Sequence, residues 1–174
     1  MPFMSNPNGE KALVFTWGEE SLTRQLLYHG SYLEIKIPQI LAGKYAKDFG
    51  TGFYCTVLRE QAVRWACRYN SPVLNIYECE KDSSLKTRDF SEMTEEWLDF
   101  IIFCRSGKKH DYEIVSGPMA NDQIYNYISD YMDGTITREQ FWVLTRFKHP
   151  THQIAFCTEV ALKSLKFMKS EIAK

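Results

Sequence analysis

The feature that most constrains the fold is the order of two apolar patterns along the chain. Five segments have the length and composition of β-strands: 26–29, 52–55, 72–79, 112–115 and 153–157. Five others carry apolar residues at helical spacing: 57–69, 94–105, 121–132, 137–147 and 158–168. The two kinds interleave without the regular β–α–β rhythm or the Gly-rich phosphate loop of a dinucleotide-binding domain. We therefore predict a single α+β domain with a compact, mostly antiparallel sheet.

Turn and capping residues set the expected boundaries of these elements. Thr56 is expected to cap the helix that follows it, and Thr137 and Gln140 form a capping-box pattern. The dipeptide at 117–118, Gly-Pro, is expected to break the strand before it. Residues 32–38 alternate like an extended segment, and residues 169–174 are expected to fray after the final helix.

The size and charge of the chain limit its organisation and partners. At 174 residues it is long enough for one domain with a sizeable core, which we expect to span 26–168 between an N-terminal arm (1–25) and a short tail (169–174). A net charge of −1 gives no overall field that would attract nucleic acid. The start has no signal-peptide pattern and the longest apolar run, 100–104, is too short to cross a bilayer. We expect a cytoplasmic protein without a membrane partner, or one exported as an effector.

The five cysteines predict neither a disulfide framework nor a metal site. They are far apart, form no CxxC pair, and mostly lie inside apolar runs. The four histidines do not combine with them at a metal-ligand spacing. Reduced, buried thiols and no bound metal are the expectation.

Two glycine-containing stretches carry the candidate chemistry. LYHGS at 27–31 and DFGTGFYCT at 48–56 each place a polar aromatic or imidazole group at the end of a short apolar run. A cleft at these strand ends would turn His29 towards Tyr54; His29 would bind a ribose hydroxyl, Tyr54 would stack on a flat ring, and Gly30 would offer its main chain to an amide. The alternative is ordinary packing of a histidine and a tyrosine in the core.

LYHGS followed by FGTGFYCT, with the helix EQAVRWACRY behind it, resembles the first two motifs of the ADP-ribosyltransferases of the diphtheria-toxin and poly(ADP-ribose) polymerase type. With IVSGPMAND and HQIAFCTEVALKSL, the chain from 26 to 166 also resembles an uncharacterised bacterial family placed near these transferases. The resemblance implies an ADP-ribosyltransferase-like fold with a split sheet flanked by helices, NAD+ as substrate, and no metal.

The resemblance also implies roles for particular residues. His29 would bind the 2′-hydroxyl of the adenosine ribose, Gly30 the nicotinamide carboxamide, and Tyr54 the nicotinamide ring. Ser31 follows in the same motif and joins the expected cofactor site. No serine stands where one usually supports the carboxamide, and Gln61 is the nearest residue to that place.

Gln153 stands where the superfamily has its catalytic glutamate. Glutamine keeps a hydrogen bond to the nicotinamide ribose but lacks the charge that stabilises an oxocarbenium-like state, so we expect a slower reaction. Gln153→Glu is expected to retain or raise nicotinamide release. Asp122, beside Asn121 in the GPMAND segment, and Glu159 are candidates for restoring a charge.

The implied activity is mono-ADP-ribosyl transfer to a protein, nucleic acid or small molecule. By analogy with bacterial toxins of this size, the chain is a candidate toxin of a toxin–antitoxin pair with a small antitoxin as partner. The alternatives are a non-catalytic module that binds NAD+ or ADP-ribose, and an NAD glycohydrolase with water as acceptor. RNA 2′-phosphotransfer on a related fold is disfavoured, because the basic residues it requires are not evident.

Overall fold

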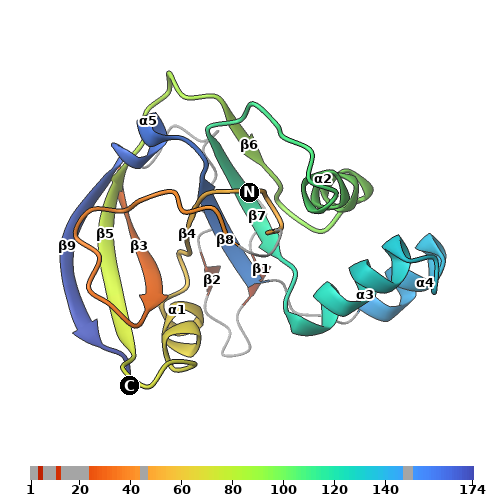
Figure 1. The fold of residues 1–174 in the computed structure, drawn as a ribbon, viewed down its shortest axis with the longest axis horizontal. Helices are drawn as coiled ribbons and strands as arrows, with labels where there is room; N and C mark the ends of the chain where they lie inside the picture. The colour runs from red at the N-terminus through yellow and green to blue at the C-terminus, as the bar shows by residue number, and fades with distance from the viewer. Residues whose placement is uncertain (1–3, 6–10, 13–23, 44–46, 147–150) are drawn as a thin grey trace.

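The molecule is built on two β-sheets that together form one α+β domain, as predicted (Figure 1). The computed structural model describes residues 4–5, 11–12, 24–43, 47–146 and 151–174. The first sheet is antiparallel, in the order β3 (Arg24–Ser31), β5 (Val73–Glu80) and β9 (Leu165–Ile172). The second is mixed, in the order β4 (Phe53–Cys55), β8 (Thr151–Phe156), β7 (Ile114–Met119) and β6 (Thr87–Asp89), with β6 and β7 parallel. The short strands β1 (Met4–Ser5) and β2 (Lys11–Ala12) pair with each other.

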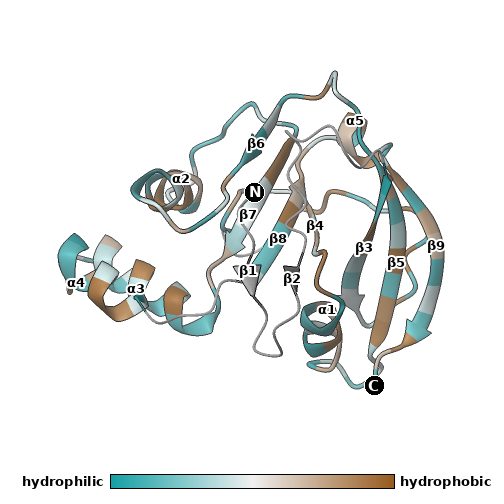
Figure 2. Ribbon diagram, turned by 180° about the vertical axis from the view of Figure 1, so that it is seen from behind, coloured by the Kyte–Doolittle hydropathy of each residue, from teal (hydrophilic) through white to brown (hydrophobic). Residues whose placement is uncertain are grey.

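Helices cover the outer faces of the two sheets. The described helices are α1 (Arg59–Ala66), α2 (Glu95–Arg105), α3 (Asp122–Met132), α4 (Arg138–Thr145) and α5 (Glu159–Leu162). Helix α1 packs on the three-stranded sheet, whereas α2, α3 and α4 lie together beside the four-stranded sheet (Figures 1 and 2). Within the described part of the chain, no helix has the length and apolar character required to cross a bilayer.

The core has three parts that follow from this layering. One cluster lies between the two sheets and joins Leu27 and Tyr77 to Phe53 and Phe156. A second, around Trp97, fills the space between the four-stranded sheet and α2, α3 and α4. The third lies between α1 and the three-stranded sheet. Each sheet is therefore buried on both faces over much of its area.

The helix starts were mostly predicted correctly, with one exception. Thr137 and Gln140 form the complete capping box at the start of α4. Thr56 does not cap α1; the N-cap is Leu58, whose N–H donates to Thr56 Oγ1 at 3.1 Å. The reason is that Thr56 still pairs with Tyr28 as an extended residue, so its backbone is held in the sheet.

Two predictions about extended segments are wrong. Strand β7 continues through Gly117 and Pro118, because the carbonyl of Pro118 points to Trp97 Nε1 (2.9 Å) and its missing N–H therefore faces away from β8. Residues 32–38 form no strand. Their backbone is held instead by side chains, with Asn75 bonded to Leu33 and Ile35 and the hydroxyl of Tyr77 donating to the carbonyl of Ile35.

The end of the chain is a strand and not a frayed helix. Helix α5 ends at Leu162, and β9 then pairs with β5 along its whole length, with Ala173 buried beyond it. The apolar residues at 165–168 fit a helical spacing as well as a strand, and pairing with a neighbouring strand decides between them.

Candidate functional site

The three stretches singled out in the sequence meet where the two sheets join. Cys55, the last residue of β4, pairs with Ile154 of β8. The next residue, Thr56, exchanges two main-chain hydrogen bonds of 2.9 Å with Tyr28 of β3. We call residues 28–31, 53–56 and 152–154 the strand junction. It brings His29, Gly30, Tyr54 and Gln153 onto neighbouring strands.

His29 is fixed in a defined tautomer at this junction. Its Nδ1 lies 2.6 Å from the main-chain oxygen of Tyr54. A carbonyl only accepts, so Nδ1 carries the proton and Nε2 of the neutral ring is an acceptor. Burial lowers the pKa of His29, with a smaller contribution from the charge of Lys47, so the ring is neutral near pH 7. Its Nε2 can therefore accept a hydrogen bond from a hydroxyl group.

Tyr54 does not form the opposite wall of a pocket for His29, and that expectation is wrong. The ring stacked on His29 is Phe53, with centroids 4.4 Å apart, and Tyr54 packs in the cluster around Trp97. The Tyr54 hydroxyl donates to Gly50 O at 2.6 Å and accepts from Phe49 N at 3.2 Å. Burial also raises the pKa of this hydroxyl.

The charge next to the Tyr54 ring belongs to Lys47, whose Nζ lies 4.7 Å from the ring centroid. A flat ligand could reach this face of the ring only if the lysine moved. Tyr54 as it stands is thus a structural residue whose main-chain oxygen orients His29.

The main chain of Gly30 points its polar groups away from β5, at the edge of the three-stranded sheet. Tyr28 points its N–H and C=O away from β5 towards Thr56, and Gly30 lies two residues further in an unbroken register. In an antiparallel pair such residues point the same way, so the Gly30 N–H and C=O also leave the edge of the sheet. Among the described residues, neither group has a hydrogen-bond partner. One donor and one acceptor are therefore available side by side, as an amide ligand requires.

The missing side chain of Gly30 is explained by helix α1. A Cβ atom at this position would lie 2.1 Å from Ala62 O and 2.7 Å from Ala66 N, so only glycine allows this approach. The same atom would lie 3.1 Å from Trp65 Cβ. The half-buried Trp65 is thus an aromatic residue whose Cβ borders Gly30 on the side of α1.

Gln153 is held by a buried carboxylate. Its side chain lies on the face of β8 that points towards the helices, is 4% exposed, and donates from Nε2 to Asp48 Oδ2 at 3.1 Å. The same oxygen accepts from Ala120 N at 2.9 Å, and Oδ1 accepts from Arg105 Nη2 at 2.6 Å and Nε at 3.2 Å. The Asp48 and Arg105 side chains are 9% and 5% exposed. Asp48 is thus a four-fold acceptor inside the protein.

The two carboxylates expected to supply charge near Gln153 do not contact it. Asp122 is exposed on α3 and pairs with Arg68 at 3.5 Å, and Glu159 is exposed at the start of α5. The carboxylate that touches Gln153 is Asp48. Asn121 caps α3 through Ile124 N at 3.0 Å, so its side chain has a structural task.

Two other residues expected to bind the cofactor form structural hydrogen bonds. Gln61 is buried, with Nε2 donating to His152 O at 2.6 Å and Oε1 accepting from His152 N at 3.1 Å, which fixes the start of β8 against α1. Ser31 is buried and its Oγ accepts from Leu33 N at 3.4 Å. Gln61 is therefore a positioning residue for the strand that carries Gln153.

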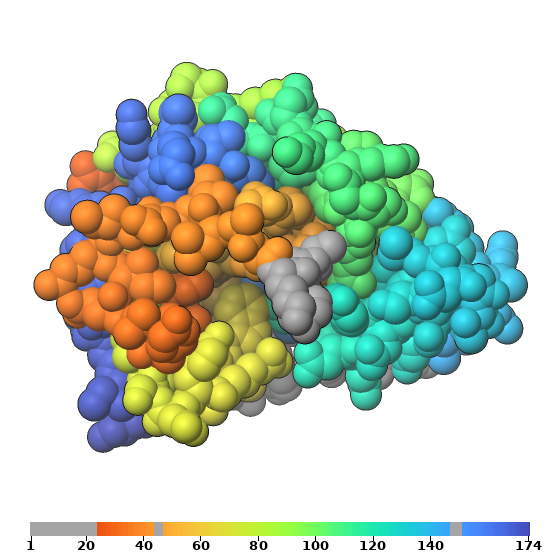
Figure 3. Space-filling model, viewed as in Figure 1, coloured from red at the N-terminus to blue at the C-terminus, as the bar shows by residue number. Residues whose placement is uncertain are grey.

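The surface is hollowed next to helix α1. Figure 3 shows a depression between the segment 32–43 (orange) and helix α1 (yellow), on the face towards the viewer. Among the described residues, no group of three or more His, Cys, Asp or Glu side chains could hold a metal ion.

Asp48, Arg105 and Trp65 are the residues that sequence reasoning missed. Asp48 opens DFGTGFYCT, but nothing near it in the sequence signals a partner, because Arg105 is 57 residues away. Trp65 recurs at helical spacing with Ala62 and Ala66, a pattern that core packing explains equally well.

A family model described as "Protein of unknown function (DUF3990)" matches residues 25–167. The match begins in β3 and ends in β9, so it includes every strand of the junction and Asp48 and Arg105. No curated protein matches the chain.

Proposed function

The chain belongs to the DUF3990 family, and from the geometry of its strand junction we propose that it binds NAD+ there and cleaves the bond between nicotinamide and ribose. ADP-ribose is then transferred to an acceptor. The bond between the ribose C1 and the nicotinamide nitrogen breaks, and its electron pair leaves with nicotinamide. An oxygen or nitrogen of the acceptor bonds to the same carbon and releases a proton.

The observation that carries the proposal is the open main chain of Gly30 beside His29. The Gly30 N–H and C=O match the carbonyl and amine of a carboxamide, which nicotinamide carries. His29 offers an acceptor nitrogen one residue away, in a neutral ring whose orientation the Tyr54 carbonyl fixes. A carboxamide and a hydroxyl are the groups that NAD+ would bring to these two positions.

We propose Trp65 as the ring wall of the pocket. Its Cβ borders the side of Gly30 that faces α1, whereas Tyr54 is buried with its hydroxyl bonded and Lys47 over its ring. We therefore assign the stacking role, which the family resemblance implies for Tyr54, to Trp65. Stacking of a flat heteroaromatic ring on an indole contributes about 1–3 kcal/mol.

Gln153 and Asp48 together supply the polar group that acts on the nicotinamide ribose. Nε2 faces the Asp48 carboxylate, so Oε1 is the atom left to accept a hydrogen bond from a ribose hydroxyl. A hydrogen bond donated to an anion polarises the amide and makes Oε1 more negative. Arg105 offsets much of the Asp48 charge, so the rate is expected to be lower than a catalytic glutamate would give.

The acceptor is a protein, a nucleic acid or a small molecule, and a small antitoxin is the partner expected if the chain is a toxin.

The test is incubation of the purified protein with labelled NAD+ and lysate, followed by measurement of nicotinamide release and labelled product. We expect both in the wild type, and loss of both in His29→Ala. Lys166→Gln, an exposed change on β9, serves as the control.

A second candidate, an NAD+-binding module without turnover, is favoured by one observation. Gln153 is neutral and its nearest carboxylate is already paired with Arg105. Two results together would support this module and exclude the transferase. The wild type would bind NAD+ without releasing nicotinamide, and His29→Ala would weaken that binding. Release of nicotinamide without labelled product would identify water as the acceptor.

A further inference from the structure

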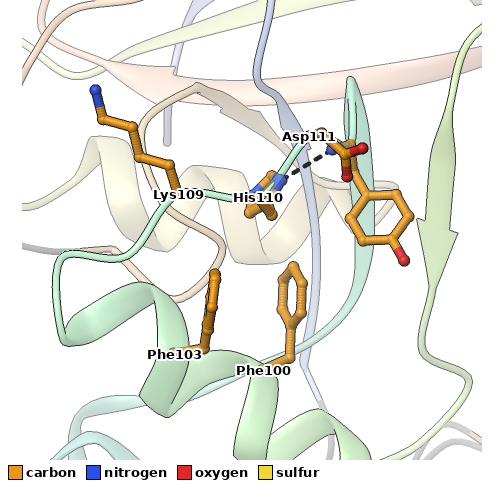
Figure 4. A pocket seen from close by; sticks show the side chains of 6 residues that line it. Phe100, Phe103, Lys109, His110 and Asp111 are labelled. Carbon is orange, nitrogen blue, oxygen red and sulfur yellow. Dashed lines mark hydrogen bonds between the residues drawn. The ribbon is translucent and has the colours of Figure 1, made fainter.

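A second hollow is lined by residues of α2, of the segment 107–112 and of the segment that leads to β4. One part, of about 450 Å³, is lined by Phe100, Phe103 and Tyr112 (Figure 4). The other, of about 560 Å³, is lined by Lys47, Lys108 and Lys109 among others. The two parts are neighbours, and we call them together the lysine hollow. They share four lining residues: Lys109, His110, Asp111 and Tyr112.

The lysine part of the hollow is strongly positive in a chain whose net charge is only −1. Within the described residues, none of the three lysines forms an ion pair. The carboxylate on the rim, Asp111, pairs with Lys86 outside the hollow. Burial also lowers the pKa of Lys47, as expected for an ammonium group that has lost water without gaining a counter-ion. An anion in the hollow would relieve this cost.

The aromatic part supplies flat surfaces next to these charges. Phe103 is half-buried with Lys108 Nζ 5.6 Å from its centroid, and Tyr112 is half-buried. Figure 4 shows Phe100 and Phe103 rising from α2 towards His110. His110 has no free nitrogen, since Nε2 donates to Phe49 O at 2.9 Å and Nδ1 accepts from Tyr112 N at 3.1 Å. It is thus a fixed part of the wall.

We propose that the lysine hollow binds a small phosphorylated nucleotide, with its phosphate among Lys47, Lys108 and Lys109 and its base against the rings of Phe103 and Tyr112. Cationic side chains beside aromatic rings are the combination that recognises a phosphate and a base together. Each part of the hollow is within the size range of small-molecule sites. The inference does not rest on the proposed function, because Gly30, Trp65 and Gln153 do not line this hollow.

The test is calorimetric titration of the full chain with AMP, adenosine, ribose 5-phosphate and inorganic phosphate. AMP should bind, and inorganic phosphate should displace it. Adenosine should bind at least about tenfold more weakly, since two or more charge-assisted hydrogen bonds are lost. Ribose 5-phosphate should bind at least about fivefold more weakly than AMP, because it lacks the base that stacks on the rings.

The decisive variant is Lys108→Gln/Lys109→Gln, which should weaken AMP binding at least about tenfold. Both lysines are exposed, and unfolding midpoints will verify that the fold is kept. Lys163→Gln/Lys166→Gln makes the same charge change outside the hollow and should bind AMP like the wild type.

Two results would overturn the proposal. They are unchanged AMP affinity in Lys108→Gln/Lys109→Gln and an equal loss of affinity in the Lys163/Lys166 control. Failure of NAD+ cleavage in the wild type would leave this test unaffected.

Discussion

Replacing Asp48 with asparagine is the most informative single change in this molecule. The carboxylate accepts four hydrogen bonds, two from Arg105, one from Ala120 N and one from Gln153. Asparagine has one acceptor oxygen, so whichever way it turns, its Nδ2 faces donors. Arg105, whose side chain is 5% exposed, would also be left without its counter-charge. Breaking such a buried pair on one side costs about 3–5 kcal/mol.

Urea unfolding measures this cost directly. With a slope of about 2 kcal/mol per molar urea, the midpoint of Asp48→Asn should fall by about 2 M relative to the wild type. The double variant Asp48→Asn/Arg105→Met should be more stable than the sum of the single changes implies, by about 1–3 kcal/mol, because the orphaned charge is gone. Asp111→Asn, which removes the partner of Lys86 on the surface, is the control and should shift the midpoint far less.

The reasoning would be refuted by a midpoint for Asp48→Asn close to that of the wild type. It would equally be refuted by strict additivity of the Asp48 and Arg105 changes, since additivity would mean that the two side chains do not interact.

Three further predictions concern the strand junction. Gly30→Ala should destabilise the fold by about 3 kcal/mol, the upper range of overpacking, because the new Cβ meets Ala62 O; urea unfolding will show it. Burial lowers the pKa of His152 to about 4 in the folded protein, whereas the pKa of an exposed histidine is about 6.5. Between these two pH values the unfolded chain therefore binds more protons than the folded one. Stability should therefore fall between about pH 6.5 and 4, and less so in His152→Phe, when unfolding is measured across this range. Gln153→Glu brings a second carboxylate against Asp48, so we expect lower stability and nicotinamide release that increases with pH, in a pH-rate profile, as the shared proton leaves.

Each of these predictions has a result that would count against it. Wild-type stability in Gly30→Ala would mean that α1 does not press on β3. An unchanged pH dependence in His152→Phe would shift the acid sensitivity to other groups, among which His29 titrates in the same direction. A pH-independent rate in Gln153→Glu would remove Asp48 from the site.

The sequence predicts local structure well where local chemistry decides it. The capping box at Thr137 and Gln140, and the strand at 72–79, follow from the side chains alone. It fails at Thr56 and at residues 165–172, where pairing with a distant strand overrides a reasonable local choice. Such pairings depend on residues far apart in the chain and leave no local pattern.

The candidate site shows the same division. His29 and Gly30 were singled out from a short strand end beside glycine, and Gln153 from the family resemblance. The structure places all three on neighbouring strands at the junction. The bond of Gln153 to Asp48 could not be found, since the two residues are 105 positions apart. The prediction that Tyr54 faces His29 was wrong, because successive side chains along β4 point to opposite faces of the sheet. Phe53, and not Tyr54, therefore stacks on His29.

The central claim is that the Gly30 main chain and His29 form an NAD+ site at the strand junction. Titration of the 15N-labelled protein with NAD+, followed by amide resonances, tests it without requiring turnover. We predict that the Gly30 amide shifts among the largest in the spectrum, while the amide of Gly134, in an exposed turn after α3, does not move. Saturable NAD+ binding that leaves the Gly30 amide unperturbed would contradict the claim.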